Sequence, residues 1–214
     1  ESVINVKKKN VTVAYNITLG KRFPIKDIEI ILPSEGTFAD DFLADTSAMT
    51  VKVGDFLSED ILENETVRAS ASLRNMGYYE FSKNNFFFEA DTLSCPDSAI
   101  LKMTVNGYTR NETPDRTRTI SRFTFNEVNI SYPQTLKIRE KILKELTTIR
   151  PGETYSTDVV NNTYTRLSSL RMFSSVNIGM TPVDSNKIDC RINLSQSKLQ
   201  GFKVNLEASS NPTG

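Results

Sequence analysis

The residues that could carry chemistry are few, and their types exclude the common catalytic mechanisms. The chain of 214 residues contains no histidine, so neither a histidine-activated nucleophile nor the usual histidine zinc site can form. The acidic pair Asp40 and Asp41, and Asp115 beside Arg116 and Arg118, lack partners that would build a pocket around them. We interpret both groups as solvated charges, and we expect no enzyme, no cofactor and no metal site.

Two cysteines, Cys95 and Cys190, are the remaining reactive side chains. Cys190 alternates with Ile188, Ile192 and Leu194, which predicts a small apolar side chain pointing into a core. Cys95 falls in a predicted hairpin turn. A disulfide between them is disfavoured, because it would have to join two separate copies of the repeat described below.

The balance of charges argues against nucleic acid and an anionic membrane surface as partners. Lys plus Arg and Asp plus Glu both total 26, so no net field attracts nucleic acid or an anionic membrane. The sequence has no signal peptide and no apolar run of transmembrane length. It starts in the middle of a strand pattern, so we expect a fragment of a longer protein.

The elements that position the side chains occur twice. Residues 54–64 read G-D-F-L-S-E-D-I-L-E-N, and residues 152–162 read G-E-T-Y-S-T-D-V-V-N-N, 98 positions later. Each copy predicts a glycine turn, a serine N-cap, an acidic residue in the first turn (Asp60 or Asp158) and a helix. An apolar stripe follows in each copy: Leu62, Thr66, Ala69, Leu73 and Met76 in the first, and Val160, Tyr164, Leu167 and Leu170 in the second.

Around these helices the chain reads strand, helix, helix, strand, strand in both copies. The expected organisation is a hairpin at 1–20 that ends a preceding module, a module at 21–107, a linker at 108–119, a module at 120–198, and a barrel-type strand starting in 199–214. The expected elements of the modules are strands at 20–33, 78–91 and 99–105 with helices at 37–45 and 58–76, and strands at 123–132, 176–180 and 188–194 with helices at 136–147 and 156–170.

Two segments outside the modules leave alternatives open. Lys7, Lys8 and Lys9 form either a solvated hairpin turn or an anion- or lipid-binding patch. The tail alternates apolar and polar residues from Phe202 to Ala208, which suits either a soluble edge strand or the first strand of a membrane barrel.

Three short motifs resemble the polypeptide-transport-associated (POTRA) domain. Residues 73–81, L-R-N-M-G-Y-Y-E-F, resemble the family's L-x-x-x-G-Y-[YF] at the end of the second helix. Residues 151–156, P-G-E-T-Y-S, resemble its G-x-x-[YF]-[ST] turn, and residues 15–23 resemble the junction between modules. The second copy departs from the pattern, because its helix ends L-R-M-F without Gly-Tyr, although residues 173–176 still resemble F-x-x-V.

The resemblance implies an α+β fold of tandem βααββ modules, each a three-stranded mixed sheet with two helices on one face. The third strand would be central and the second would lie at an edge, where extended peptides bind by strand addition. The candidate edges are 84–90 and 175–180. In the Phe86–Phe87–Phe88 run, side chains alternate between faces, so some rings belong to the core and we expect at least one on the back of the sheet. The residues expected to contact a client or partner are Asn85, Phe86, Phe87, Phe88, Glu89, Ser175, Val176, Asn177 and Ile178.

The function implied is that of a periplasmic POTRA region in an outer-membrane protein assembly or translocation factor of the BamA or TamA type. Its partners would be unfolded outer-membrane proteins or accessory envelope proteins, and it would reach the membrane through a C-terminal barrel beyond this sequence. The alternatives are the POTRA region of a two-partner secretion transporter and a cell-envelope scaffold without a barrel.

Overall fold

Two units make up the chain. The computed structural model describes residues 2–7, 10–15, 20–34, 36–106, 120–184 and 186–197. Contacts divide the chain into Glu1–Ser70 with Ser82–Arg118, and Ala71–Phe81 with Thr119–Gly214. The linker expected at 108–119 and the barrel-type strand expected in 199–214 lie outside the described residues.

The N-terminal segment forms the expected hairpin. Strands β1 (Ser2–Lys7) and β2 (Asn10–Tyr15) pair antiparallel, from Ser2 opposite Tyr15 to Lys7 opposite Asn10. Lys8 and Lys9, between the strands, lie outside the described residues. Two strands alone are at best marginally stable in water, so the assignment of this hairpin to a preceding module stays a prediction.

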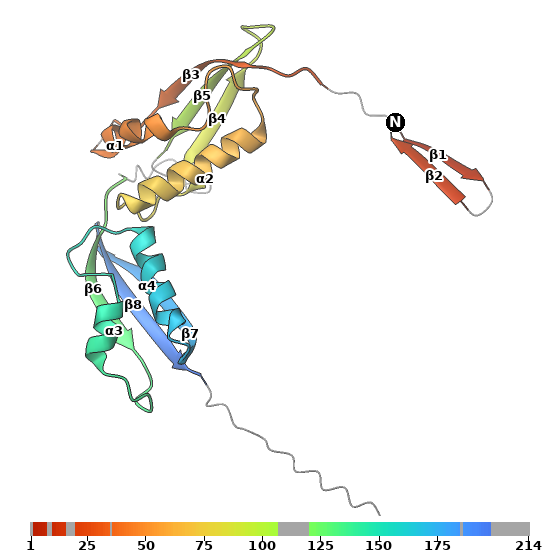
Figure 1. The fold of residues 1–214 in the computed structure, drawn as a ribbon. Helices are drawn as coiled ribbons and strands as arrows, with labels where there is room; N and C mark the ends of the chain where they lie inside the picture. Colours follow the sequence, from red (N-terminus) through yellow and green to blue (C-terminus); the bar gives the residue numbers. More distant parts are fainter. Residues whose placement is uncertain are drawn as a thin grey trace, which may run out of the picture. The chain divides into compact units, whose positions relative to one another are not determined.

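The first unit contains the sheet β3–β5–β4 (Figure 1). Its last strand in sequence is central, with β3 parallel to it and β4 antiparallel, as the resemblance implied. The elements are β3 (Ile25–Ile31), α1 (Phe38–Asp45), the 3₁₀ turn η1 (Thr46–Ala48), α2 (Glu59–Asn75), the 3₁₀ turn η2 (Lys83–Asn85), β4 (Phe86–Asp91) and β5 (Ala99–Val105). The last residues of α2, from Ala71 onward, group with the second unit.

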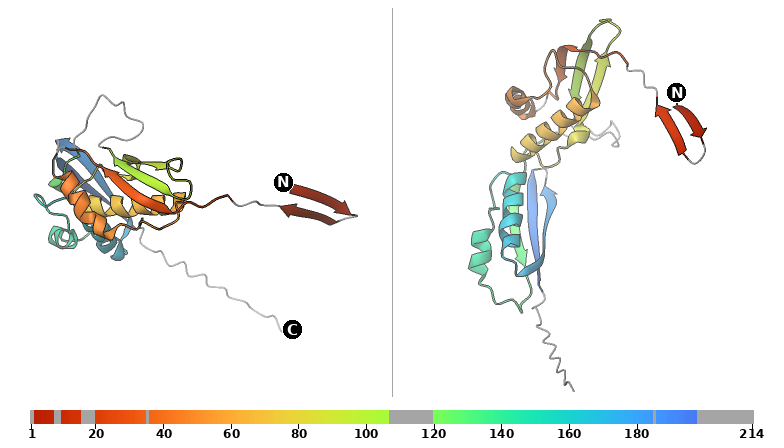
Figure 2. Two further views of the ribbon diagram at one scale, coloured as in Figure 1. Left: turned by 90° about the horizontal axis from the view of Figure 1, so that it is seen from above. Right: turned by 45° about the vertical axis from the view of Figure 1, so that its right-hand side comes forward.

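The second unit repeats this topology as β6–β8–β7, again with the last strand central. Both of its helices lie over one face of the sheet (Figures 1 and 2). The chain therefore has the α+β architecture expected for tandem modules. The elements are β6 (Thr124–Ser131), α3 (Glu140–Leu146), α4 (Thr157–Ser169), β7 (Phe173–Asp184) and β8 (Lys187–Gln196).

Each central strand buries every second side chain. The buried residues are Ala99, Leu101, Met103 and Val105 in β5, and Ile188, Cys190, Ile192 and Leu194 in β8. Because successive side chains of a strand point to opposite faces, these rows define the face that packs under the helices. The burial of Cys190 predicted from its spacing is confirmed.

The apolar stripe of the first long helix is confirmed, but that of α4 is partly wrong. Ala69 and Leu73 are buried in α2, and Leu167 is buried in α4. Tyr164, expected in the α4 stripe, has 51% of its surface exposed, and Thr163 occupies the buried position instead. A polar residue is buried there because its hydroxyl has a partner, as shown below.

The first helix of the second unit is shorter than predicted. It was expected over 136–147, but α3 begins only at Glu140, after Arg139 in an extended conformation. Leu136 and Ile138 pack against the core from an irregular segment. Their spacing is that of an apolar helix face, although the backbone there is not helical. Within α3, Leu143 is buried and Ile142 is 43% exposed.

A part-buried polar contact ties the segment between the two helices to the second helix in both units. In the first unit, Thr50 donates from its backbone N–H and its hydroxyl to Glu65 Oε2, each at 2.7 Å. Arg68 pairs with Glu65 at 2.6 Å and with Asp45 at 2.8 Å. The hydrogen bond to Glu65 raises the pKa of Arg68, which therefore stays charged.

The second unit places the same contact 98 residues later with different chemistry. The N–H of Thr148 donates to Thr163 Oγ1 at 3.0 Å, and the two hydroxyls are 2.8 Å apart. Thr163 is fully buried, as Glu65 nearly is. A partly buried N–H that lacks a partner costs stability, so either side chain suits this position as long as it offers an acceptor.

The two glycine turns have the conformation that their sequence predicted. Gly54 and Gly152 have φ values of 97° and 85°, in the left-handed region that glycine adopts at little cost. The serine caps after them differ. Ser58 Oγ accepts from the N–H of Ile61 at 3.4 Å, as predicted, whereas Ser156 makes no cap bond in α4.

Asn75 replaces Ser156 as the cap of α4. Its Oδ1 accepts from the N–H of Asp158 at 2.9 Å, and its Nδ2 donates to Asp158 Oδ2 at 2.8 Å. The hydroxyl of Ser156 donates to the same Asn75 oxygen at 3.1 Å. The acceptor comes from a segment that groups with the second unit but lies far upstream in sequence.

Gly77 ends α2 in a left-handed conformation. With φ at 111° it directs the chain so that the N–H of Tyr78 reaches the carbonyl of Leu73 at 3.1 Å. A Cβ on Gly77 would lie 2.7 Å from Thr154 Cγ2 and 3.1 Å from Arg122 Cβ. Only glycine therefore fits here, both for conformation and for space.

We expect Glu65→Ala to lower the free energy of unfolding by about 3 kcal/mol, because it leaves Arg68 and the N–H of Thr50 without their shared acceptor. Urea unfolding followed by circular dichroism measures this change. Glu63→Ala on the exposed side of α2 is the control, with an expected change within about 0.5 kcal/mol. Equal effects of the two substitutions would refute a structural role for the contact between Thr50 and Glu65.

We expect Gly152→Ala to cost about 1 kcal/mol, since nothing lies within 4 Å of its added Cβ and only backbone strain remains. Gly77→Ala should cost roughly 2 kcal/mol more, because Thr154 and Arg122 must also move. Thermal unfolding of the two variants separates strain from crowding. If both lose the same stability, the close approach at Gly77 is unimportant.

Candidate functional site

Strands β4 and β7 each lie at one margin of their sheet. β4 pairs with β5 from Phe86 opposite Val105 to Asp91 opposite Ile100, and β7 pairs only with β8. No other strand in the described part of the chain pairs with either of them. Their outer sides therefore present backbone N–H and C=O groups that another extended chain can pair with.

The three phenylalanines at the start of β4 divide between the two faces of the sheet. Phe86 and Phe88 stack at 6.3 Å with 6° between their rings, and Phe86 also lies 6.1 Å from Phe42 of α1. Because side chains alternate, Phe87 points to the opposite face, where it is half-buried beside its pair partner Thr104. Phe87 is thus the ring expected on the back of the sheet.

A groove of about 630 Å³ follows this edge. Its rim charges are already paired, Lys83 with Glu63 at 3.2 Å and Glu89 with Lys102 at 3.7 Å. An aromatic groove beside an open edge suits an extended segment with alternating apolar residues, bound mainly through its backbone. The residues that line it are Lys83, Asn84, Phe86, Phe87, Phe88, Glu89 and Thr104.

Asn85 is not part of this edge, contrary to the sequence prediction. It lies in η2 and is 4% exposed. Its Oδ1 accepts from the N–H of Ser82 at 2.9 Å, and its Nδ2 donates to the carbonyl of Asn106 at 2.8 Å. The side chain closes a turn, and the open edge begins one residue later, at Phe86.

The second predicted edge lies within β7. Ser175 and Asn177 are exposed, whereas Val176 and Ile178 are half-buried and pack against the core of the unit. The strand continues to Asp184, so the open edge is longer than the predicted 175–180.

The thiols are free and differ in environment. Cys95 is half-buried in the turn after β4, whereas Cys190 is buried in the core. Burial raises the pKa of the Cys190 thiol to about 12.

No group of three or more His, Cys, Asp or Glu side chains that could hold a metal occurs among the described residues. Within the same residues, no helix is long and apolar enough to cross a membrane.

One candidate surface escaped the sequence prediction, namely the outer edge of β6 beside α3. Two signals were present in the sequence. One is the phase shift within 123–132, which is a bulge between Phe125 and Val128. The other is the basic segment around α3, which contains Lys137, Arg139, Lys141, Lys144 and Arg150.

Each unit has the fold of a POTRA domain, and solved structures of POTRA domains are similar to this chain in fold. POTRA domains 3 to 5 of BamA from Haemophilus influenzae align with a TM-score of 0.56 and 15% identity, over 92% of this chain and 71% of that chain. BamA from Haemophilus ducreyi lacking POTRA domains 1 to 3 aligns with a TM-score of 0.59 and 14% identity, over 82% of this chain.

At this level of identity the likeness shows the fold. The chain spans 30% of the Haemophilus ducreyi structure. No protein-family model matches the sequence, and no curated protein sequence matches it.

We expect a thiol reagent at neutral pH to modify Cys95 and to spare Cys190 until the chain unfolds. The unfolded thiol ionises near its ordinary pKa, whereas the folded one stays protonated up to about pH 12. The contribution of Cys190 to stability is therefore full below about pH 9 and is lost as pH rises toward 12. Mass spectrometry of the alkylated native chain measures how many thiols have reacted. Prompt modification of both cysteines would contradict the buried position of Cys190.

Proposed function

We propose that the chain is the periplasmic POTRA region of an outer-membrane β-barrel assembly or translocation protein. In this proposal it binds unfolded outer-membrane proteins, or accessory envelope proteins, by strand addition. The main support is that the same module occurs twice, each time with its second strand open on the outer side. The POTRA fold and the resemblance over residues 73–81 favour the same class.

The mechanism proposed is binding without covalent chemistry. The edges at Phe86–Glu89 and Ser175–Ile178 would pair with the backbone of an extended client, so affinity would depend little on client sequence. The groove beside Phe87 would take apolar side chains that alternate along a barrel strand. Neither an enzymatic activity nor a cofactor is part of the proposal.

Two related functions remain as alternatives. A two-partner secretion transporter would pass one exported protein, and a scaffold without a barrel would hold envelope proteins together. The sequence that follows Gly214 in the full protein distinguishes them, since ten-residue strands of alternating hydropathy indicate a barrel. A further POTRA module before Glu1 would disfavour the two-partner transporter.

We expect photo-crosslinking residues at Phe87 and Asn177 to capture an unfolded outer-membrane protein diluted from denaturant. The matched control is Asn193, which lies directly opposite Asn177 but on the central strand β8. Capture should be lost with a client peptide whose alternate backbone amides are methylated, because methylation removes the N–H donors. Equal capture at Asn193, or no capture at either edge, would refute strand addition at these strands.

A further inference from the structure

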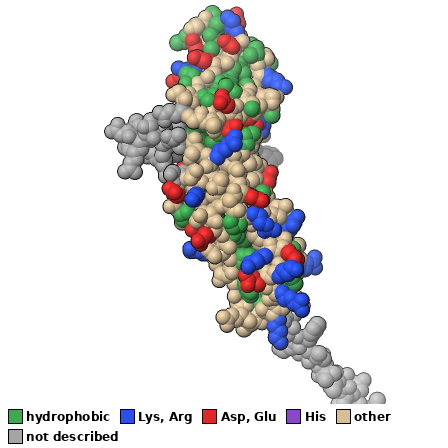
Figure 3. Space-filling view, turned by 90° about the vertical axis from the view of Figure 1, so that its left-hand side faces the viewer, with side chains coloured by type: hydrophobic (Ala, Val, Ile, Leu, Met, Phe, Trp, Pro, Cys, Tyr) green, Lys and Arg blue, Asp and Glu red, His purple; other side chains and the backbone are tan. Residues whose placement is uncertain are grey.

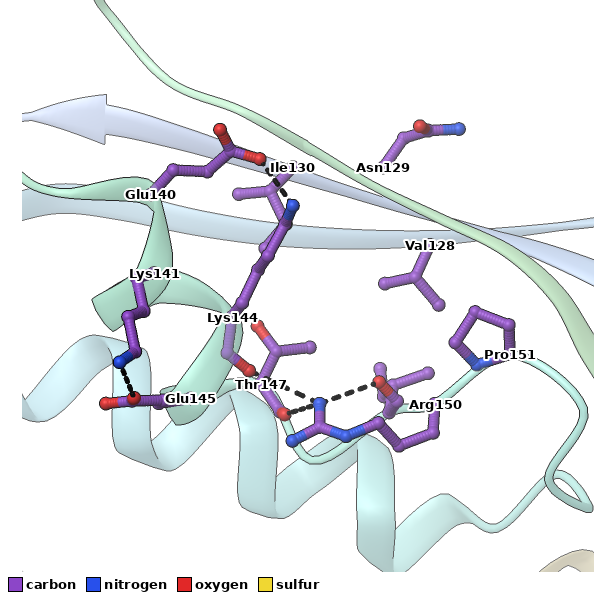
Figure 4. Close-up of a pocket in the computed structure, with 11 residues that line it drawn as sticks. Val128, Asn129, Ile130, Glu140, Lys141, Lys144, Glu145, Thr147, Arg150 and Pro151 are labelled. Atoms are coloured by element: carbon purple, nitrogen blue, oxygen red, sulfur yellow. Dashed lines mark hydrogen bonds and ion pairs between the residues drawn. The ribbon is translucent and has the colours of Figure 1, made fainter.

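A second groove lies at the opposite margin of each sheet, between the first strand and the segment that holds the first helix. In the second unit its volume is about 780 Å³, and it is lined by Val128–Ile130 of β6, by charged residues of α3, by Thr147 and by residues 149–151 (Figure 4). In the first unit a groove of about 390 Å³ occupies the corresponding place beside Ile28 and Ile30 of β3. A groove that recurs in both modules is a feature of the fold.

The beginning of the β6 outer edge is closed by the glycine turn. The N–H of Phe125 donates to the carbonyl of Glu153 at 2.9 Å, and the N–H of Gly152 donates to the carbonyl of Phe125 at 2.7 Å. Two residues then bulge out, and Asp189 Oδ1 holds them by accepting from Asn126 Nδ2 at 2.7 Å and from the N–H of Glu127 at 3.2 Å.

Beyond the bulge the edge is open. Residues 128–131 pair with β8 on one side, and no described strand pairs with them on the other. Four residues at about 3.3 Å each give an open edge of roughly 13 Å, enough to pair with a short extended segment. Figure 4 shows Val128 turned toward the groove and Asn129 turned away from it.

The rim of this groove is basic. Lys144 pairs with Glu140 at 2.7 Å and Lys141 with Glu145 at 3.9 Å, both as exposed pairs within α3. Arg150 donates to backbone carbonyls, including those of Lys144 and Ile149, and no carboxylate in the described part of the chain forms an ion pair with it. Figure 3 shows Lys and Arg side chains gathered on one face of this unit. The exposed basic residues around α3 are Lys137, Arg139, Lys141, Lys144 and Arg150, against Glu140 and Glu145.

We propose that residues 128–131 form a second strand-addition site, whose occupant is an extended polypeptide segment with acidic side chains. The proposal rests on the proposed function for the mode of binding, but it uses the other margin of the sheet and adds a charge requirement. The open backbone and the apolar floor of Val128, Ile130 and Ile149 favour a polypeptide, because a membrane surface would use only the charges. Acidic residues complement the net positive charge of the rim, where five basic residues outnumber two glutamates.

The test uses the full chain and two labelled ten-residue peptides that alternate valine with glutamate or valine with glutamine. Fluorescence anisotropy at low salt should show the glutamate peptide binding about tenfold more tightly, and about 0.5 M salt should remove that preference. The double variant Lys141→Gln/Lys144→Gln should also remove it. Lys52→Gln, at the position in the first unit that corresponds to Arg150, should leave it unchanged.

A photo-crosslinker at Asn129 locates the site. It should capture the glutamate peptide, and one at Glu29, the corresponding position in β3, should capture at least fivefold less. Equal affinity for the two peptides, or no capture at Asn129, would overturn the proposal. So would binding to vesicles of anionic phospholipid without binding to the peptide. Capture at Phe87 and Asn177 but not at Asn129 would overturn this inference alone, whereas the reverse pattern would overturn only the proposed function.

Discussion

In both units the arrangement depends on one part-buried hydrogen bond between the segment that joins the helices and a buried side chain of the second helix. The backbone N–H of Thr50 or Thr148 finds its acceptor on a buried side chain of α2 or α4. The anchored segment leads directly into the glycine turn, which bonds to the start of the first strand. This contact therefore fixes which part of the first strand is closed and which part stays open.

The two units reach this geometry with different chemistry. Glu65 brings a charge into the interior, and it is stabilised there by Arg68 and by the N–H and hydroxyl of Thr50. Thr163 meets the same demand with a hydroxyl and needs no counter-charge. The position requires an acceptor of suitable reach rather than a particular residue type, so repeated modules can diverge widely in sequence while keeping their open edges.

Most of the fold followed from local patterns, and the errors arose where distant polar partners decide the outcome. Alternation predicted the buried row of β8, and the repeated motif predicted the glycine turns at Gly54 and Gly152. The cap of α4 could not be predicted from Ser156, because its acceptor is Asn75, far upstream in sequence. The local sequence around Asn85 is typical of a strand, but a hydrogen bond from its side chain to the carbonyl of Asn106 holds it in a turn.

Local patterns also predicted part of the candidate site, namely which strands lie at the sheet edges and which side chains share a face. Edge strands follow from topology, which the order of elements implies, and the alternation at Phe87 follows from strand geometry.

Hydrogen–deuterium exchange of the chain, with and without a saturating unfolded outer-membrane protein, tests most directly whether open edges are the binding surface. We expect new protection of amides in β4 and β7, with no change in the already paired β5 and β8. Protection confined to the helices, with the amides of β4 and β7 unaffected, would contradict this account.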